Sequence, residues 1–140
     1  MPAPSPTPVA WADPARRAAF ERWLDRQTAQ HGLLPPTLEP ASADASFRRY
    51  FRIQGAGGSF IVMDAPPPQE DVRPFVHMAG LINAAGLNAP TVFACDAELG
   101  FVLLEDLGRK LYLDALREAS AAQADALMRD AIRALVHFQQ

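Results

Sequence analysis

The stretch DASFRRYFRI, residues 44–53, brings together side chains that can bind an anion. Ser46 and the backbone amides beside it can donate hydrogen bonds to phosphate-like oxygens, and Arg48 and Arg49 supply positive charge just after it. A simpler interpretation is that Asp44 closes a turn by accepting a local backbone hydrogen bond, while the arginines lie in solvent. The two interpretations of the turn are compatible, so the stretch is a candidate anion site.

The arginines of this stretch alternate with aromatic residues, which predicts a β-strand with two different faces. Side chains at alternate positions of a strand point to opposite sides of the sheet. One face is expected to carry Arg48, Tyr50 and Arg52, and the other Phe47, Arg49, Phe51 and Ile53. An arginine face could look toward an anion while the aromatic face packs on the domain, but solvated arginines at a sheet edge are the commoner case.

Two other segments resemble ligand sites. LLEDLG, residues 103–108, ends an apolar segment at an acidic turn. It is either a strand that stops at a polar turn or a segment whose backbone meets a ligand, and the pattern alone leaves both open. GAGG, residues 55–58, lacks the strand, glycine-rich turn and helix of a phosphate-binding loop, so we interpret it as a hairpin turn.

Periodicity and capping residues predict the elements that position these segments. A first helix is expected from Asp13, with Pro14 at its first position, to near Gly32. LLPP then favours an extended connection. From Thr37 to Ala65 the apolar period changes to two, which predicts a three-stranded antiparallel meander.

The same signals predict both helices and strands in the second half of the chain. A helix that Asp71 can cap and Gly86 can stop carries apolar residues at helical spacing: Val72, Phe75, Val76, Ala79 and Ile82. Strands are expected at 91–96 and 101–106, joined by the turn 97–100. Helical structure is expected after Gly108, followed by a last helix over 119–140 with a stripe of Leu127, Ala131, Leu135 and Phe138.

Composition narrows the class of protein. The 140 residues suit a single domain with a real core. The net charge of −3 argues against a nucleic-acid binder, which usually carries an excess of Lys and Arg. Cys95 is the one cysteine, and the three histidines lie far apart in sequence, so no metal site is expected. The sequence shows neither a secretory signal nor a membrane span, and we expect a cytoplasmic protein without membrane contact.

The motifs DASFRRYFR, VMDAPPP and LLEDLG resemble the aminoglycoside phosphotransferase family, most closely its bacterial cell-wall sugar kinases that act on the anomeric position of N-acetylmuramate and N-acetylglucosamine. The resemblance implies an α+β fold: a protein-kinase-like N-terminal lobe, with a five-stranded antiparallel sheet and one packed helix, followed by the first helices of a C-terminal lobe. It divides the chain into a flexible proline-rich lead over 1–12, a nucleotide-binding lobe over 13–105, and a hinge with helices over 106–140.

The resemblance also implies which residues meet a nucleotide. Phosphoryl transfer needs a site that holds the base, cradles the phosphates and supplies a metal. The backbone at 105–107 would pair with the adenine edge, and the loop 41–46 would cover the phosphates of ATP. The implied ATP-binding residues are Asp44, Ser46, Phe47, Arg48, Arg49, Met63, Leu104, Glu105, Asp106 and Leu107. Mg²⁺ is implied as a cofactor, but its ligands are not expected in this chain.

The sequence departs from this family's pattern in the third strand, where related kinases carry a lysine paired with a glutamate on the neighbouring helix. That strand holds Met63 and Asp64, and the one lysine of the chain, Lys110, lies beyond the hinge. Our hypothesis is that Arg48 or Arg49 replaces the missing lysine. Asp64 near a triphosphate would be repelled by about 4 kcal/mol, so it must point away, face a metal or pair with an arginine.

The catalytic aspartate and metal-binding residues of the family are also missing, and we expect that the chain alone transfers no phosphate. The leading hypothesis is thus the ATP-binding part of an amino-sugar kinase; the alternative is a noncatalytic nucleotide-binding or regulatory module. Nucleic-acid binding through the aromatic and basic strand is disfavoured by the acidic balance. The apolar stripe of the last helix predicts self-association of the isolated chain.

Overall fold

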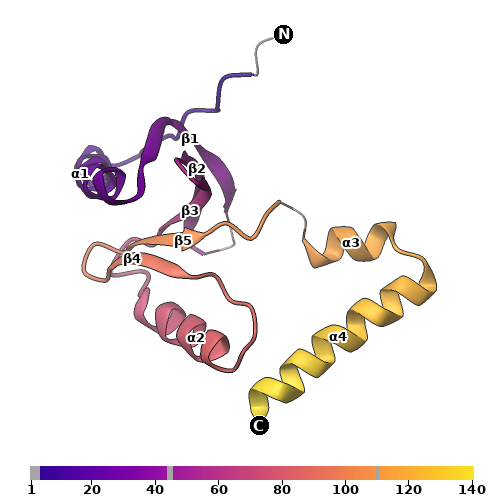
Figure 1. The fold of residues 1–140 in the computed structure, drawn as a ribbon. Coiled ribbons are helices and arrows are strands. Elements are labelled where there is room, and N and C mark those ends of the chain that lie inside the picture. The colour runs from indigo at the N-terminus through magenta and orange to yellow at the C-terminus, as the bar shows by residue number, and fades with distance from the viewer. Residues whose placement is uncertain (1–3, 44–45, 110) are drawn as a thin grey trace.

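The computed structural model describes residues 4–43, 46–109 and 111–140 and has an α+β fold. Its elements are α1 (Pro14–His31), β1 (Leu33–Ala43), β2 (Arg49–Gly55), β3 (Gly58–Asp64), α2 (Arg73–Ala84), β4 (Val92–Asp96), β5 (Phe101–Glu105), α3 (Tyr112–Glu118) and α4 (Ala121–Gln139) (Figure 1). The strands form one antiparallel sheet in the order β1-β2-β3-β5-β4. The predicted kinase-like N-terminal lobe is confirmed.

The first helix covers one face of the sheet and has the predicted ends. The side chain of Asp13 accepts a hydrogen bond from the amide of Ala15 at 2.9 Å, and Gly32 closes the helix with a φ of 63°, a conformation that favours glycine. The buried side of α1 carries Phe20, Trp23 and Leu24. These side chains pack against buried residues of β2, β3 and β5, and so form the main core: Phe51, Ile53, Val62, Phe101 and Leu103.

The N-terminal segment packs on the same core from Val9 onward. The ring of Trp11 lies 4.9 Å from that of Phe20 and 6.0 Å from that of Phe51. This part of the segment expected to be a flexible lead is therefore held by aromatic contacts, which the proline-rich composition did not indicate.

Strand β1 begins earlier than predicted. The sequence LLPP was expected to be a connection, but Leu33 already pairs with Gly55. The register then shifts between Leu34 and Glu39, around two prolines that cannot donate to a ladder. Since β1 is an edge strand, it can hold these prolines without breaking the sheet.

The second face of the sheet carries a smaller core and α2. Met63, Ala65, Val72, Val102 and Leu104 are buried there, and Phe75 of α2 packs against them. The predicted cap of this helix is wrong by one residue: Val72 is the N-cap, and Asp71, just before it, accepts a hydrogen bond from the amide of Arg73 at 3.0 Å.

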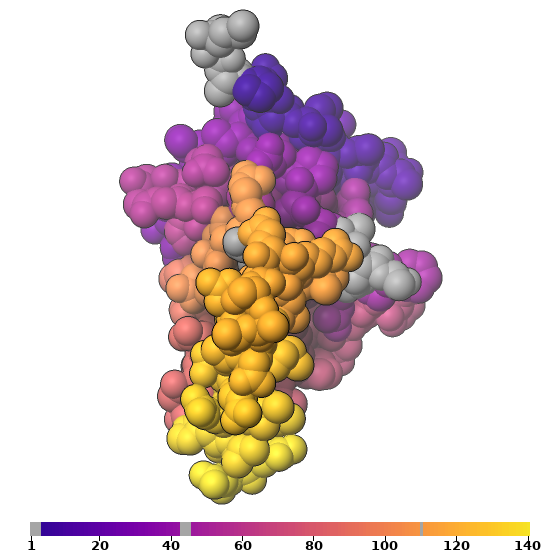
Figure 2. All heavy atoms as spheres, turned by 90° about the vertical axis from the view of Figure 1, so that its right-hand side faces the viewer, coloured from indigo at the N-terminus to yellow at the C-terminus, as the bar shows by residue number. Residues whose placement is uncertain are grey.

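The two last helices extend away from the sheet (Figure 1). In Figure 2 the orange and yellow atoms of α3 and α4 form a column that leads down from the body of the lobe. None of the described residues of α4 is buried. The end of α4 returns to α2, where Nε2 of His137 lies 2.6 Å from the carbonyl oxygen of Ala85. Among the described residues, no helix is long and apolar enough to cross a membrane.

Candidate functional site

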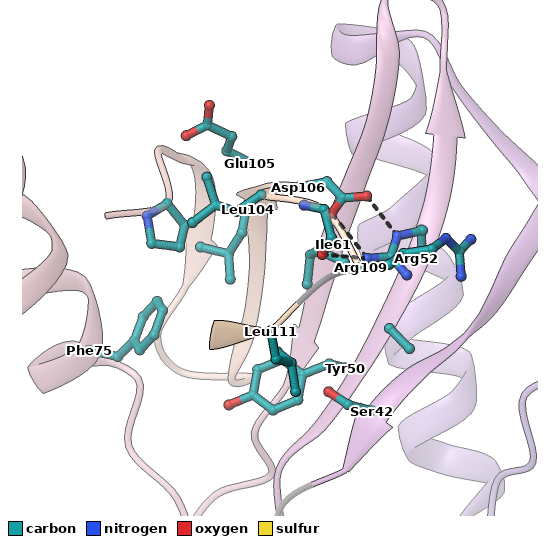
Figure 3. Close-up of a pocket in the computed structure, with 14 residues that line it drawn as sticks. Ser42, Tyr50, Arg52, Ile61, Phe75, Leu104, Glu105, Asp106, Arg109 and Leu111 are labelled. Carbon is teal, nitrogen blue, oxygen red and sulfur yellow. Dashed lines mark hydrogen bonds and ion pairs between the residues drawn. The ribbon is translucent and has the colours of Figure 1, made fainter. Parts of the chain in front are cut away.

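A cleft of about 490 Å³ lies on the face of the sheet opposite α1, where β5 runs into the linker (Figure 3). Its volume falls within the usual range of small-molecule sites, about 300–1,000 Å³. The sheet, the start of α2, the connection before β4 and the linker contribute its lining residues: Ala41, Ser42, Tyr50, Arg52, Ile61, Phe75, Pro90, Leu104, Glu105, Asp106, Leu107, Gly108, Arg109 and Leu111.

Apolar side chains form the walls of the cleft. Ile61 of β3 and Leu104 of β5 are paired across the sheet, so both side chains point to this face. Tyr50 and Phe75 add aromatic rings, and Leu111 approaches from the linker. Such walls can hold a flat, mostly apolar ring system, because burying it releases water from both surfaces.

The linker at the end of β5 presents backbone groups beside these walls. Glu105 is anchored to Thr91: its amide donates to the carbonyl oxygen of Thr91 at 2.9 Å, and its carboxylate accepts from the amide of Thr91 at 3.2 Å. No hydrogen bond within residues 4–43, 46–109 and 111–140 involves the peptide groups of Leu107. The N–H and C=O of Leu107 can therefore pair with a polar ring edge.

The side chain of Asp106 is turned into the protein (Figure 3). Its carboxylate accepts hydrogen bonds from Arg52 Nε at 2.6 Å and Arg52 Nη2 at 3.1 Å, from Ser59 Oγ at 2.6 Å and from the Gly108 amide at 2.9 Å. The hydrogen bonds from Arg52 hold the pKa of Asp106 well below its usual range, although burial opposes this. Asp106 thus ties the linker to β2 and β3, and its side chain is not aimed at a ligand.

A second ion pair marks the other end of the same sheet face. Arg48 Nε donates to Glu70 at 3.0 Å, and the amide of Phe47 donates to the other oxygen of the same carboxylate at 3.3 Å. Burial lowers the pKa of Arg48, but hydrogen bonds to Glu70 and Tyr50 outweigh it and leave the pKa raised. Arg48 is therefore a fixed positive charge next to Tyr50.

The profile of the phosphotransferase enzyme family matches residues 37–140 of this chain. The chain belongs to that family. The N-acetylmuramate/N-acetylglucosamine kinases of Pseudomonas aeruginosa and Pseudomonas putida are each 50% identical to it, over 136 and 125 residues, which cover 92% and 84% of this chain. The kinase of the same name from Neisseria meningitidis is 43% identical over 127 residues, or 89% of this chain. These matches confirm the resemblance seen in the three motifs.

The chain spans less than two-fifths of the length of these curated relatives: the matches cover 39%, 36% and 36% of them. All the residues that line the cleft fall within residues 37–140, the range that the family profile matches. The described residues contain no group of three or more His, Cys, Asp or Glu side chains that could hold a metal ion.

The structure brings some of the predicted site residues of this chain together. Leu104, Glu105, Asp106 and Leu107 line the cleft. Ser46 accepts a hydrogen bond from the Arg48 amide at 3.2 Å and is not among the lining residues. Asp44 lies outside the described residues.

Three predicted residues are placed elsewhere. Phe47 is 64% exposed and Met63 is fully buried in the smaller core. Arg49 lies on the α1 face, where it donates to Asp64 at 3.0 and 3.2 Å and its guanidinium covers the ring of Trp11 at 4.5 Å. Asp64 also forms an ion pair with Arg16 at 2.6 Å. Of the three arrangements expected for Asp64, the structure therefore shows pairing with arginine.

Sequence reasoning missed most of the cleft walls. Tyr50 and Arg52 were expected on one face of β2 that could look toward an anion, but their place in the wall of this cleft was not predicted. Ile61 could have been found from its strand position once β3 and β5 were known to be neighbours. Phe75 and Leu111 arrive from separate elements, and no local signal points to them.

Proposed function

We propose that the cleft binds the base of ATP and that the chain is the nucleotide-binding part of a kinase that phosphorylates an amino sugar, N-acetylmuramate or N-acetylglucosamine. The observation that carries this proposal is the apolar cleft lined by the neighbouring side chains of Ile61 and Leu104, which reaches Leu107, whose peptide groups form no hydrogen bond with the other described residues. A purine has the matching shape, with two apolar faces and a polar edge. Membership of the phosphotransferase enzyme family supplies the phosphate donor chemistry.

The names of the relatives supply the proposed sugar. Each of the three proteins described above is an N-acetylmuramate/N-acetylglucosamine kinase. In this proposal residues 13–105 form the nucleotide-binding lobe, and residues 106–140 form the hinge and the first helices of the second lobe. We assign no Mg²⁺ ligand to the described residues, among which no group of three or more His, Cys, Asp or Glu side chains could hold a metal ion. An enzyme that uses ATP in this way would act in the cytoplasm.

Thermal unfolding with increasing concentrations of ATP tests the base site. Ligand that binds only the folded chain raises its melting temperature in a concentration-dependent way. We expect such a rise for the unmodified chain and its loss in Ile61→Trp, because the larger ring fills the cleft. Leu34→Trp is the control, since Leu34 is 50% exposed and lies outside the cleft. An unmodified chain whose melting temperature does not change with millimolar ATP would overturn the proposal.

Activity of the complete protein is a separate test of the proposed reaction. Phosphate transfer from ATP to N-acetylmuramate or N-acetylglucosamine is the expected result. Binding of ATP without transfer to either sugar would favour the alternative, a noncatalytic nucleotide-binding or regulatory module.

A further inference from the structure

We propose that Arg48, held in place by Glu70, is the cation that positions the terminal phosphates of the nucleotide. This inference rests on the proposed function, because it presumes that the base occupies the cleft. Arg48 and Glu70 both lie outside the cleft lining. The third strand carries no cationic side chain on this face, where Met63 is buried.

Arg48 lies on the correct face of the sheet. Tyr50 and Arg52 both line the cleft, and alternate residues of a strand share a face. The side chain of Arg48 also lies near that of Tyr50, whose proximity is among the causes that raise the pKa of Arg48. Arg48 immediately precedes β2, and its contacts with Tyr50 and Glu70 place its side chain on the same side as the cleft-facing Tyr50 and Arg52.

Arg48 also lies at the correct distance from the linker. In the sheet, Glu105 pairs with Phe60, which pairs with Ile53. Ile53 lies two strands from Glu105, or about 10 Å, and Arg48 is five positions before Ile53, or about 16 Å along the strand direction, so Arg48 lies roughly 19 Å from Glu105. An extended nucleoside triphosphate spans a similar length. A base at Leu107 would therefore place its outer phosphates near Arg48.

The other arginines near this face have different partners. Arg52 is engaged with Asp106, with side chains that are 9% and 6% exposed. Arg109 is at the linker end, where it binds Glu39 at 3.0 Å. Arg49 faces the opposite side of the sheet and binds Asp64. Among these arginines, Arg48 is the one at the phosphate end of the cleft face.

The contacts of Glu70 orient Arg48 without using all of its donors. One carboxylate oxygen binds Nε, and the other binds the amide of Phe47, which fixes the backbone that carries Arg48. A guanidinium has five N–H donors, so the terminal nitrogens can still reach phosphate oxygens. The side chain of Arg48 is 24% exposed, which leaves it accessible to a ligand from solvent. The pair thus combines a fixed orientation with an open side.

Binding of adenosine, ADP and ATP to the same chain tests this assignment. For the unmodified chain we expect affinity to increase from adenosine to ATP. Arg48→Gln should lower the affinity for ATP by about tenfold or more and leave that for adenosine unchanged, because charge-assisted hydrogen bonds to phosphate are lost. Arg48→Lys should have an ATP affinity between those of the unmodified chain and of Arg48→Gln, because lysine keeps the positive charge but lacks the planar guanidinium. Glu70→Gln should weaken ATP binding less than Arg48→Gln.

The controls separate this inference from the proposed function. Arg17→Gln removes an arginine of an exposed ion pair on α1 and should leave every affinity unchanged. The role of Arg48 would be overturned, but the proposed base site would not, if Arg48→Gln lowered the affinities for adenosine and ATP equally or changed neither affinity. The role of Arg48 would also be overturned if the unmodified chain bound adenosine, ADP and ATP with equal affinity. A chain that binds neither adenosine nor ATP would overturn the proposed function, and this assignment with it.

Discussion

Arg52 and Asp106, separated by 54 positions in sequence, form a two-pronged ion pair with N–O distances of 2.6 and 3.1 Å. The pair fastens the linker to β2 at the point where the cleft ends. Ser59 of β3 donates to the same carboxylate. The linker backbone beside the apolar cleft is thus held by side chains from two strands before any ligand arrives.

Replacing Asp106 with Asn should strongly destabilise the chain. The change leaves the guanidinium of Arg52 buried without a counter-charge, and breaking a buried pair in this way costs about 3 kcal/mol or more. Urea unfolding measures the loss. Arg129→Gln is the control: it removes one member of an exposed pair on α4, with side chains 66% and 63% exposed, and should change the free energy of unfolding little. Equal effects of the two substitutions would show that the Arg52–Asp106 pair has no special role.

The same pair predicts how stability depends on pH. The folded state lowers the pKa of Asp106 below the value of about 3.9 in an unfolded chain. Its contribution to stability is therefore complete above the unfolded pKa and is lost as pH falls through the folded pKa. The difference in free energy of unfolding between the unmodified chain and Asp106→Asn should be constant from pH 7 to about 5 and should shrink in more acidic solution. A difference that stays constant to pH 2 would contradict this.

Gly100 is predicted to tolerate no side chain. Its φ is +79°, and a Cβ built on it would clash with the carbonyl oxygen of Ala65. That contact cannot relax easily, because Ala65 and Gly100 are joined by a backbone hydrogen bond of 2.8 Å. Gly100→Ala should therefore destabilise the chain by more than about 2 kcal/mol, through backbone strain and steric displacement.

Gly80→Ala is the matched substitution in α2. Nothing lies within 4 Å of the Cβ it would add, and alanine in a helix interior is favoured over glycine by about 1 kcal/mol. Chemical denaturation should show opposite signs for the two changes. A neutral Gly100→Ala would mean that the turn between β4 and β5 differs from the one described.

The exposed apolar side of α4 should drive self-association of the chain. Met128, Ile132, Leu135 and Val136 are each about half exposed on this helix, at 48%, 56%, 55% and 49%, and patches of this kind mark protein interaction surfaces. Sedimentation at increasing concentration should show larger species, and the double substitution Ile132→Glu with Leu135→Glu should reduce them. Arg133→Glu changes the net charge equally and is the control. A monomer at all concentrations would rule the association out.

Local signals were sufficient for most elements of this chain. Asp13, Pro14 and Gly32 predicted both ends of α1, because caps act within one turn of the backbone. Period-two patterns predicted β2 and β3, since the strand geometry itself alternates side chains. The motif LLEDLG likewise marked the end of β5 and the linker, which line one side of the cleft.

The partners of the charged residues were decided by the tertiary structure. Sheet order places β3 beside β5, so Asp106 meets Arg52 and Ser59, and Ile61 meets Leu104. Arg48 and Arg49 are neighbours in sequence and equivalent in charge, yet one faces the cleft side with Glu70 and the other meets Asp64 near α1. Sequence by itself determined which residues share a strand face. The tertiary structure decided what each face meets, because those contacts join elements that are distant in the chain and depend on how the elements pack.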